Sequence, residues 1–167
     1  MNAQQLKQRY SCGERLFIKA KLAYADLSLL ELSHINLSGA DLSHAAFHGA
    51  TLICANFTRA NLAKAKLIGA DLSGADLSFC NLSHALLSSV ELAGACLDGA
   101  NLENATLSHS NLRGANLRNA NLFDANLRGA DLRGADLIGA NLDRADLSDI
   151  ILEDPSFSSD EPRADYP

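Results

Sequence analysis

The side chains best suited to chemistry are four cysteines, five histidines and many serines. The cysteines, Cys12, Cys54, Cys80 and Cys96, have no C-x-x-C spacing, so they are interpreted as reduced thiols of a cytoplasmic protein. The serines lie in no G-x-S-x-G motif, and neither a P-loop nor a G-x-G-x-x-G fingerprint occurs. The sequence therefore predicts no enzyme activity and no catalytic residue.

A metal site would need ligands that the fold brings together. His34 and Cys54 are 20 residues apart, but the next three positions at that spacing are glycines. His44 and His84 have Lys64 midway between them. Because structural zinc needs four ligands, no metal ion and no other cofactor is expected.

The elements that position these residues follow from a repeat of five residues, which runs without interruption from Arg15 to Asp154. The central residue i is Leu or Phe in all 28 pentads. Position i−2 is Ala in 21 pentads, position i−1 is Asn or Asp in 17, and ten of the eleven glycines lie at i+2. Such regularity predicts a single repetitive domain.

A period of five excludes a helix or a straight strand as the repeating element. Five residues turn an α-helix by ~140°, which would spread the leucines around it. An odd step would send successive leucines to opposite faces of a strand. The leucines converge only if the chain turns a corner after every pentad. Four corners complete a square coil of 20 residues, and the 28 pentads stack at ~4.8 Å into about seven coils, roughly 34 Å long.

Residues 20 apart are expected to stack into columns outside this core, while the side chains at i and i−2 point inward. Stacked amides form ladders, and one column contains the asparagines Asn61, Asn81, Asn101, Asn121 and Asn141. The stacking also predicts ion pairs of Asp98 with Arg118 and of Asp124 with Arg144. Glycine at i+2 fits a corner with positive φ, whereas corners with Ser, His or Lys are expected to use another turn type.

The A(D/N)LXX pattern resembles the pentapeptide-repeat family, and the resemblance covers about 140 of the 167 residues. It implies an all-β fold, the right-handed quadrilateral β-helix, and the handedness is implied by this resemblance alone. Many members, notably cyanobacterial ones, have no assigned role. Others are quinolone-resistance proteins that resemble a DNA duplex in shape and charge and bind DNA gyrase or topoisomerase IV.

The two ends of the β-helix need protection, because its edges are unpaired. Residues 1–14 are predicted to form a cap with a short polar helix over 2–10, and the β-helix is assigned to 15–154. Residues 155–167, which hold all three prolines, are expected to form a flexible acidic tail. Ile150, Ile151 and Leu152 are interpreted either as a bulky lid on the last coil or as an end-to-end contact, so the chain is expected to be a monomer or an end-to-end homodimer.

The surface charge is concentrated on one predicted face. Its acidic residues are Glu31, Asp71, Glu91, Asp131, Glu153 and Asp154, which with Arg113 and Arg133 give a net charge of −4. The other faces sum to +1, −1 and −1. This face is the candidate site for a basic protein partner. The net charge of −6 argues against direct nucleic-acid binding, and no apolar stretch reaches membrane-spanning length.

The leading hypothesis is therefore a non-enzymatic structural or protein-interaction module whose partner is unknown. The alternative is a DNA-mimicking inhibitor of DNA gyrase or topoisomerase IV. B-DNA would present ~20 phosphates over such a rod, whereas the most acidic face offers six acids against two arginines. The sequence also lacks a loop between repeats and a clear C-terminal helix, both common in the quinolone-resistance members. An accessory domain of a larger protein is a third possibility.

Replacement of Leu102 by Ala should lower the free energy of unfolding by ~2–5 kcal/mol, because it leaves a cavity between stacked leucines. A one-residue insertion beside Leu87 should cost more, since it shifts the register of every later pentad. Denaturant unfolding of both variants measures this ranking. A smaller loss for the insertion than for Leu102→Ala would contradict the stacked repeat.

Overall fold

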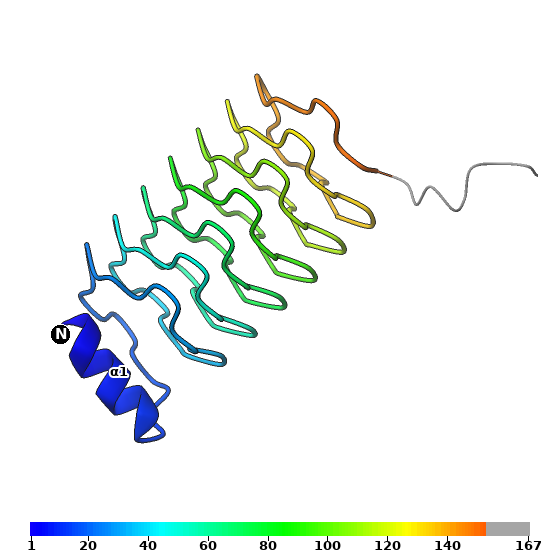
Figure 1. Ribbon diagram of the computed structural model, residues 1–167. Helices are drawn as coiled ribbons and strands as arrows, with labels where there is room; N and C mark the ends of the chain where they lie inside the picture. The colour runs from blue at the N-terminus through cyan, green and yellow to red at the C-terminus, as the bar shows by residue number, and fades with distance from the viewer. Residues whose placement is uncertain (153–167) are drawn as a thin grey trace, which may run out of the picture.

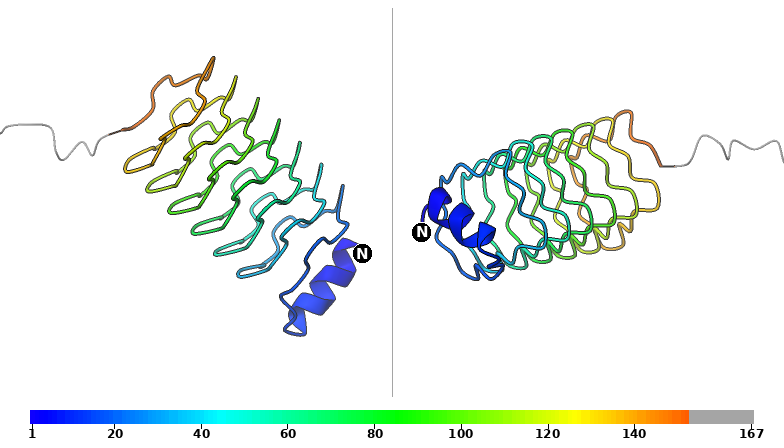
Figure 2. Two further views of the ribbon diagram at one scale, coloured as in Figure 1. Left: turned by 180° about the vertical axis from the view of Figure 1, so that it is seen from behind. Right: turned by 60° about the horizontal axis from the view of Figure 1, so that its bottom comes forward.

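The chain stacks on itself every 20 residues through most of its length (Figure 1). In the computed structural model, which describes residues 1–152, parallel β-bridges run from Leu16↔Asn36 to Asp131↔Ile151 and always join residues 20 apart. Each bridge is isolated, so within the described residues the strands are reduced to single bridge positions at i−1. The architecture is a repeat solenoid whose successive turns lie side by side in every view (Figure 1 and Figure 2).

Backbone hydrogen bonds connect each pentad to the turns before and after it. The N–H at i−1 donates to a carbonyl of the preceding turn, and the N–H groups at i and i+2 donate to carbonyls of the following turn. The N–H at i+3 closes the corner by donating to the carbonyl at i. Around Leu37 the four donors are Asn36, Leu37, Gly39 and Ala40, and the acceptors are Arg15, Asn56, Thr58 and Leu37, at 2.7–3.0 Å.

The fifth N–H of the pentad, at i+1, is bound by the side chain at i−1. The Oδ1 atom of Asn36, for example, accepts a hydrogen bond from the backbone N–H of Ser38 at 3.0 Å. The same bond occurs in all 17 pentads with Asn or Asp at i−1. It explains the composition at i−1, because a short side-chain oxygen can reach the N–H two residues on.

The interior is filled by the side chains at i and i−2, as predicted. Leu72, Leu92 and Leu112 are fully buried, and the alanines between them are almost equally buried. Cys80 occupies an alanine position in this core, and burial raises the pKa of its thiol, as expected for a small apolar core residue rather than a nucleophile. Phe47 and Phe57 meet edge to face at a centroid distance of 6.2 Å.

The prediction that corners with Ser, His or Lys use another turn type is wrong. Lys64, His84 and Ser89 at i+2 have φ of 59°, 56° and 55°, close to the 64° of Gly94. Every corner must direct the next Leu to the same axis, so the register imposes the left-handed conformation regardless of residue type. A non-glycine residue with this conformation costs ~1–3 kcal/mol of strain. The packing of the neighbouring turns maintains the conformation in spite of this cost.

One helix, α1 (Ala3–Ser11), lies across the N-terminal end of the solenoid. Asn2 caps it in a reciprocal capping box with Gln5, with bonds of 2.9 and 3.0 Å. Leu6 is fully buried in the core, and the hydroxyl of Tyr10 donates to the Ser33 carbonyl at 2.9 Å. The helix therefore covers the first turn of the core. No helix in residues 1–152 is long and apolar enough to span a membrane.

Ser110 provides a test of the packing, because its Oγ is buried and has no hydrogen-bond partner among the described residues. Ser110→Ala should raise the free energy of unfolding by ~1–3 kcal/mol, since the desolvation cost of the hydroxyl disappears. Ser88→Ala is the control, because the hydroxyl of Ser88 is bonded to that of Ser108 at 3.0 Å. Chemical denaturation measures both, and a destabilising Ser110→Ala would show that the hydroxyl is satisfied.

Candidate functional site

Four of the six acids predicted to share one face lie in one column of the solenoid. Bridges connect Glu31 through Thr51 to Asp71, then Asp71 directly to Glu91, and Glu91 through Asn111 to Asp131. We call these positions the acidic column. Two further predicted members, Glu153 and Asp154, lie outside the described residues.

The electrostatic environment differs along the acidic column. At one end Glu31 lines a hollow beside α1 that Lys7 and Tyr10 also line. At the other end Arg133 binds Asp131 through both carboxylate oxygens at 2.5–3.1 Å. Arg113 approaches the same carboxylate at 3.8 Å. The hydrogen bonds from Arg133 are the main reason that the pKa of Asp131 lies below its ordinary value.

The middle of the acidic column carries two adjacent acids that pair with no cation in the described part of the chain. Asp71 accepts bonds from the backbone N–H and hydroxyl of Ser73 at 2.9 and 2.6 Å. Glu91, which is exposed, accepts a bond from Nδ2 of Asn111 at 2.7 Å. The corner next to them is formed by Gly74 and Gly94, so no side chain at that position shields the carboxylates. Asp71 and Glu91 are therefore the centre of the candidate site.

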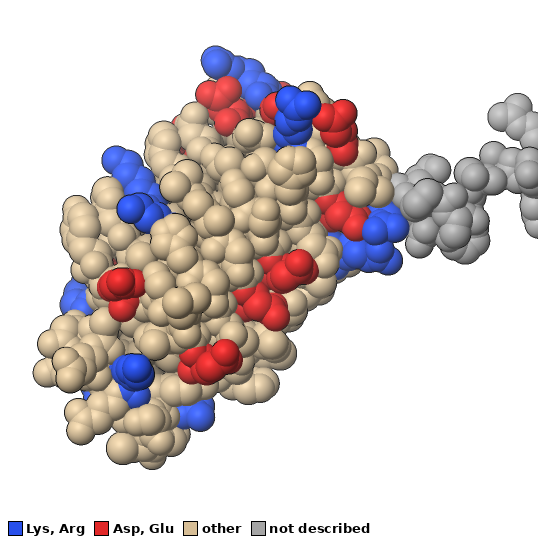
Figure 3. All heavy atoms as spheres, viewed as in Figure 1, with Lys and Arg blue, Asp and Glu red and all other residues tan. Residues whose placement is uncertain are grey.

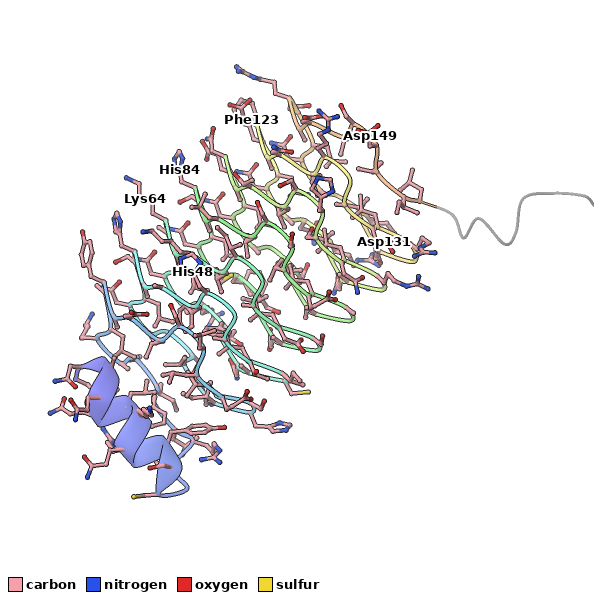
Figure 4. All side chains as sticks on the ribbon, in the orientation of Figure 1. His48, Lys64, His84, Phe123, Asp131 and Asp149 are labelled. Carbon is pink, nitrogen blue, oxygen red and sulfur yellow. The ribbon has the colours of Figure 1, made fainter. Side chains whose placement is uncertain are left out.

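The whole surface does not form one acidic stripe. On the side seen in Figure 3, acidic and basic side chains are interspersed, some in contact with each other and others surrounded by uncharged surface. Figure 4 shows Lys64 and His84 projecting from one edge of the solenoid, whereas Asp131 lies across from them. The candidate site is thus local, extending over adjacent turns rather than along the full rod.

The predicted amide ladder is confirmed. Asn81, Asn101, Asn121 and Asn141 each donate Nδ2 to the Oδ1 of the asparagine 20 residues earlier, at 3.1–3.5 Å. These Oδ1 atoms also accept the backbone N–H at i+1 in the pentads of Asn61, Asn81, Asn101 and Asn121. The ladder is consequently a structural element whose acceptors are occupied within the protein.

One predicted ion pair is present and the other is wrong. Arg144 contacts Asp124 at 3.4 Å, as expected. Arg118 instead binds Asp136 at 2.9 Å, and Asp98 accepts a bond from Asn119 Nδ2 at 3.1 Å. The long guanidinium reaches across to position i−1 of the next turn, where the carboxylate also accepts a backbone N–H at 3.0 Å.

The residues considered for metal or covalent chemistry are dispersed. No three or more His, Cys, Asp or Glu side chains within residues 1–152 are arranged to hold a metal ion. Cys54 is exposed at a corner, and its sulfur would lie 3.4 Å from a Cβ added at Gly74. His44 stacks on Tyr24 at a centroid distance of 4.6 Å, with the rings inclined by 11°. These side chains have structural neighbours rather than a shared site.

The three residues predicted to make an end-to-end contact differ in their orientation and burial. Ile150 is half-buried against the core, while Ile151 is the last bridge residue of the acidic column and is 40 % exposed. Leu152 is 58 % exposed. The core also opens toward this end, since Leu137 and Leu142 are only half-buried.

The repeat architecture and the recurrent side-chain roles define a class of non-globular repeat solenoids. The family model for pentapeptide repeats matches the chain in 8 copies between residues 16 and 154. The chain therefore belongs to the pentapeptide-repeat family. A search of the curated proteins found no match to it.

Solved structures of the same family are similar to this chain. HetL, a pentapeptide-repeat protein involved in heterocyst differentiation regulation in Nostoc sp. strain PCC 7120, is 31 % identical, with 92 % of this chain and 98 % of HetL covered and a TM-score of 0.28. A trypsin-treated form of QnrB1, a plasmid-mediated fluoroquinolone resistance protein, is 26 % identical. That match covers 81 % of this chain and 70 % of QnrB1 with a TM-score of 0.56.

Removal of the guanidinium beside Asp131 should raise the pKa of this carboxyl toward about 3.9. Because the folded-state pKa is lowered, the Asp131 interaction stabilises the fold above the unfolded pKa and is lost as the pH falls through the folded pKa. Arg133→Gln should therefore shift the carboxyl titration of Asp131 upward, as followed by NMR. Arg144→Gln, which affects the Asp124 pair instead, is the control. An unchanged titration midpoint in Arg133→Gln would contradict the assignment.

Proposed function

We propose that this chain is a non-enzymatic module that binds another protein through the outward side chains of its flat faces. The observation that supports the proposal is which groups are already packed or hydrogen-bonded within the protein. The interior is filled by leucine and alanine, and most backbone N–H groups are bound by carbonyls or, in the 17 pentads with Asn or Asp at i−1, by a side-chain oxygen. Along the flat faces, the outward columns alone remain for recognition. We also infer the finer architecture, a right-handed quadrilateral β-helix of about seven coils over 15–154 with a cap over 1–14.

The acidic column is the proposed binding surface, with Asp71 and Glu91 at its centre and Glu31 and Asp131 flanking them. Two stacked carboxylates with no cationic partner in residues 1–152 attract a basic surface. The glycine corner lets a partner approach closely beside Glu91, since Gly94 has open space where a Cβ would lie, whereas the sulfur of Cys54 lies 3.4 Å from that position at Gly74. A partner with Lys or Arg residues spaced by about 5 Å would match the spacing of the two turns.

A second candidate is inhibition of DNA gyrase or topoisomerase IV by mimicry of a DNA duplex. The similarity to QnrB1, a fluoroquinolone resistance protein, favours it. The charge distribution supports it less, because Asp131 is bound by arginines and the adjacent pair Asp71 and Glu91 is local. A duplex presents a phosphate charge every ~1.7 Å. For this reason the general protein-binding module is the leading proposal.

Reversal of the central charges tests the proposed surface. The wild-type chain should capture proteins from the native cell that cross-link next to the acidic column. The variant Asp71→Lys/Glu91→Lys should no longer capture them, because the attraction to a basic partner becomes repulsion. Glu103→Lys/Asp143→Lys is the matched control, since it makes the same charge change on another face. Retention of all partners by the Asp71/Glu91 variant would contradict the proposal.

A gyrase supercoiling assay separates the two candidates. The DNA-mimic candidate requires inhibition by micromolar chain and loss of inhibition in the Asp71→Lys/Glu91→Lys variant. Absence of inhibition by the wild-type chain would remove that candidate and leave the general module.

A further inference from the structure

A groove lies between α1 and the first turn of the solenoid, at the end that α1 crosses (Figure 2). It consists of two hollows of about 690 and 380 Å³, which share Lys7, Ser11 and Leu30 and so form one groove. The first hollow is also lined by Gln4, Gln8 and Asp26, and the second by Tyr10, Leu29 and Glu31. The two walls and the floor of this groove differ in their chemistry.

One wall of the groove is the backbone edge of the first turn. From Asn36 onward, the N–H at i−1 donates to the preceding turn, and the carbonyls at i−1 and i+1 accept hydrogen bonds from its N–H groups. At this wall α1 lies where a preceding turn would be. Within residues 1–152, the N–H groups of Asp26 and Glu31 therefore have no acceptor, and the carbonyls of Asp26, Ser28 and Glu31 have no donor. Such an edge is a template for another extended backbone segment.

The opposite wall is a polar side of α1. It presents Gln4, Lys7 and Gln8, whose side chains form no hydrogen bond or ion pair within residues 1–152. An extended segment has hydrogen-bonding groups along both of its edges. One edge would pair with the first turn, and the amide and ammonium groups of α1 would bind the other. The groove therefore matches a peptide backbone better than a purely apolar ligand.

The floor of the groove is apolar, because the repeat departs there from its own pattern. Leu30 is at i−2, where 21 of 28 pentads have Ala, and it is half-buried. Leu29, at the preceding corner, is 78 % exposed. Together with Tyr10, these leucines offer a surface for one apolar side chain of a ligand. Leu27 and Leu32, in contrast, are buried, so the ligand residues opposite them must be small.

The charges of the groove favour a basic segment. Asp26 and Glu31 are exposed, lie at i−1 in successive pentads and form no ion pair within residues 1–152. Of the residues that line the groove only Lys7 is basic, so the carboxylates exceed the cations by one charge. Side chains at i−1 of adjacent turns lie side by side. A Lys or Arg residue of the ligand would therefore be stabilised beside each carboxylate.

We propose that this groove binds an extended peptide segment of a partner protein, with two basic residues five positions apart. The segment takes the place of a preceding turn, so its basic residues lie beside Asp26 and Glu31. Opposite the corner at Leu29, where φ is 58°, the segment needs glycine. The next residue is apolar and rests on Leu30. The expected ligand pattern is thus basic-x-x-Gly-apolar-basic.

An eight-residue peptide, acetyl-Ala-Lys-Ala-Ser-Gly-Leu-Lys-Ala-amide, tests the proposal with the full chain. At up to about 1 mM, it should shift the amide NMR signals of Asp26 and Glu31 and slow their hydrogen exchange, because both N–H groups gain an acceptor. The same peptide with valine in place of glycine is the matched control. It should bind at least about tenfold more weakly, since a β-branched residue disfavours positive φ.

Variants of the chain identify the charges that bind the peptide. Asp26→Asn/Glu31→Gln should weaken binding of the glycine peptide at least about tenfold. Asparagine at position 26 keeps an acceptor for the N–H of Ser28. Asp71→Asn/Glu91→Gln is the matched control, because it removes two carboxylates outside the groove, and it should leave binding unchanged.

Three results would overturn the proposal: unchanged amide signals of Asp26 and Glu31, equal binding of the two peptides, or an equal loss of binding in both variants. Self-association of the chain that Leu29→Ala abolishes in sedimentation would assign the groove to a second copy and overturn it too. The capture test of the acidic column changes Asp71 and Glu91 instead, so the failure of either proposal leaves the other standing.

Discussion

The structure depends on one constraint: each residue must lie beside the residue 20 positions further along the chain. The backbone has no long strand or helix in residues 12–152 to satisfy its polar groups. Its N–H groups instead donate to carbonyls of the preceding and following turns, to the carbonyl that closes each corner, and to one side-chain oxygen. Because the bonds between turns recur from pentad to pentad, a departure in one turn would disturb its neighbours. The small alanine at i−2 and the large leucine at i fill the space that this spacing leaves.

The same constraint determines how the protein presents chemistry to a partner. Side chains at equivalent positions form columns about 4.8 Å apart, so the surface consists of lines of groups rather than a cavity. One line differs from the rest: the acidic column, in which Asp71 lies beside Glu91 and neither acid pairs with a cation of residues 1–152.

Two local predictions failed for the same physical reason, namely that the turn above or below outweighs local preference. Residues such as His84 adopt positive φ because the corner must direct the chain to the next leucine. Arg118 binds Asp136 in the following turn rather than Asp98, which is stacked in the preceding turn. The 20-residue spacing in the sequence predicts correctly which Cα atoms stack in a column. It does not predict the partner of a long side chain, because several neighbours lie at comparable distances.

The five-residue period by itself determined the repeat architecture, the inward position of Leu and Ala, and the asparagine ladder. These features need only a corner at each pentad, because a period of five cannot place leucines on one side of a regular helix or strand. Only the tertiary structure decided which acids of the acidic column have no cationic partner among the described residues. Arg133 binds Asp131 and no cation in residues 1–152 reaches Asp71 or Glu91, since side-chain reach and the position of each corner depend on three-dimensional packing. The role of Asn and Asp at i−1 also emerged there, because the composition records the preference but not the N–H group that it satisfies.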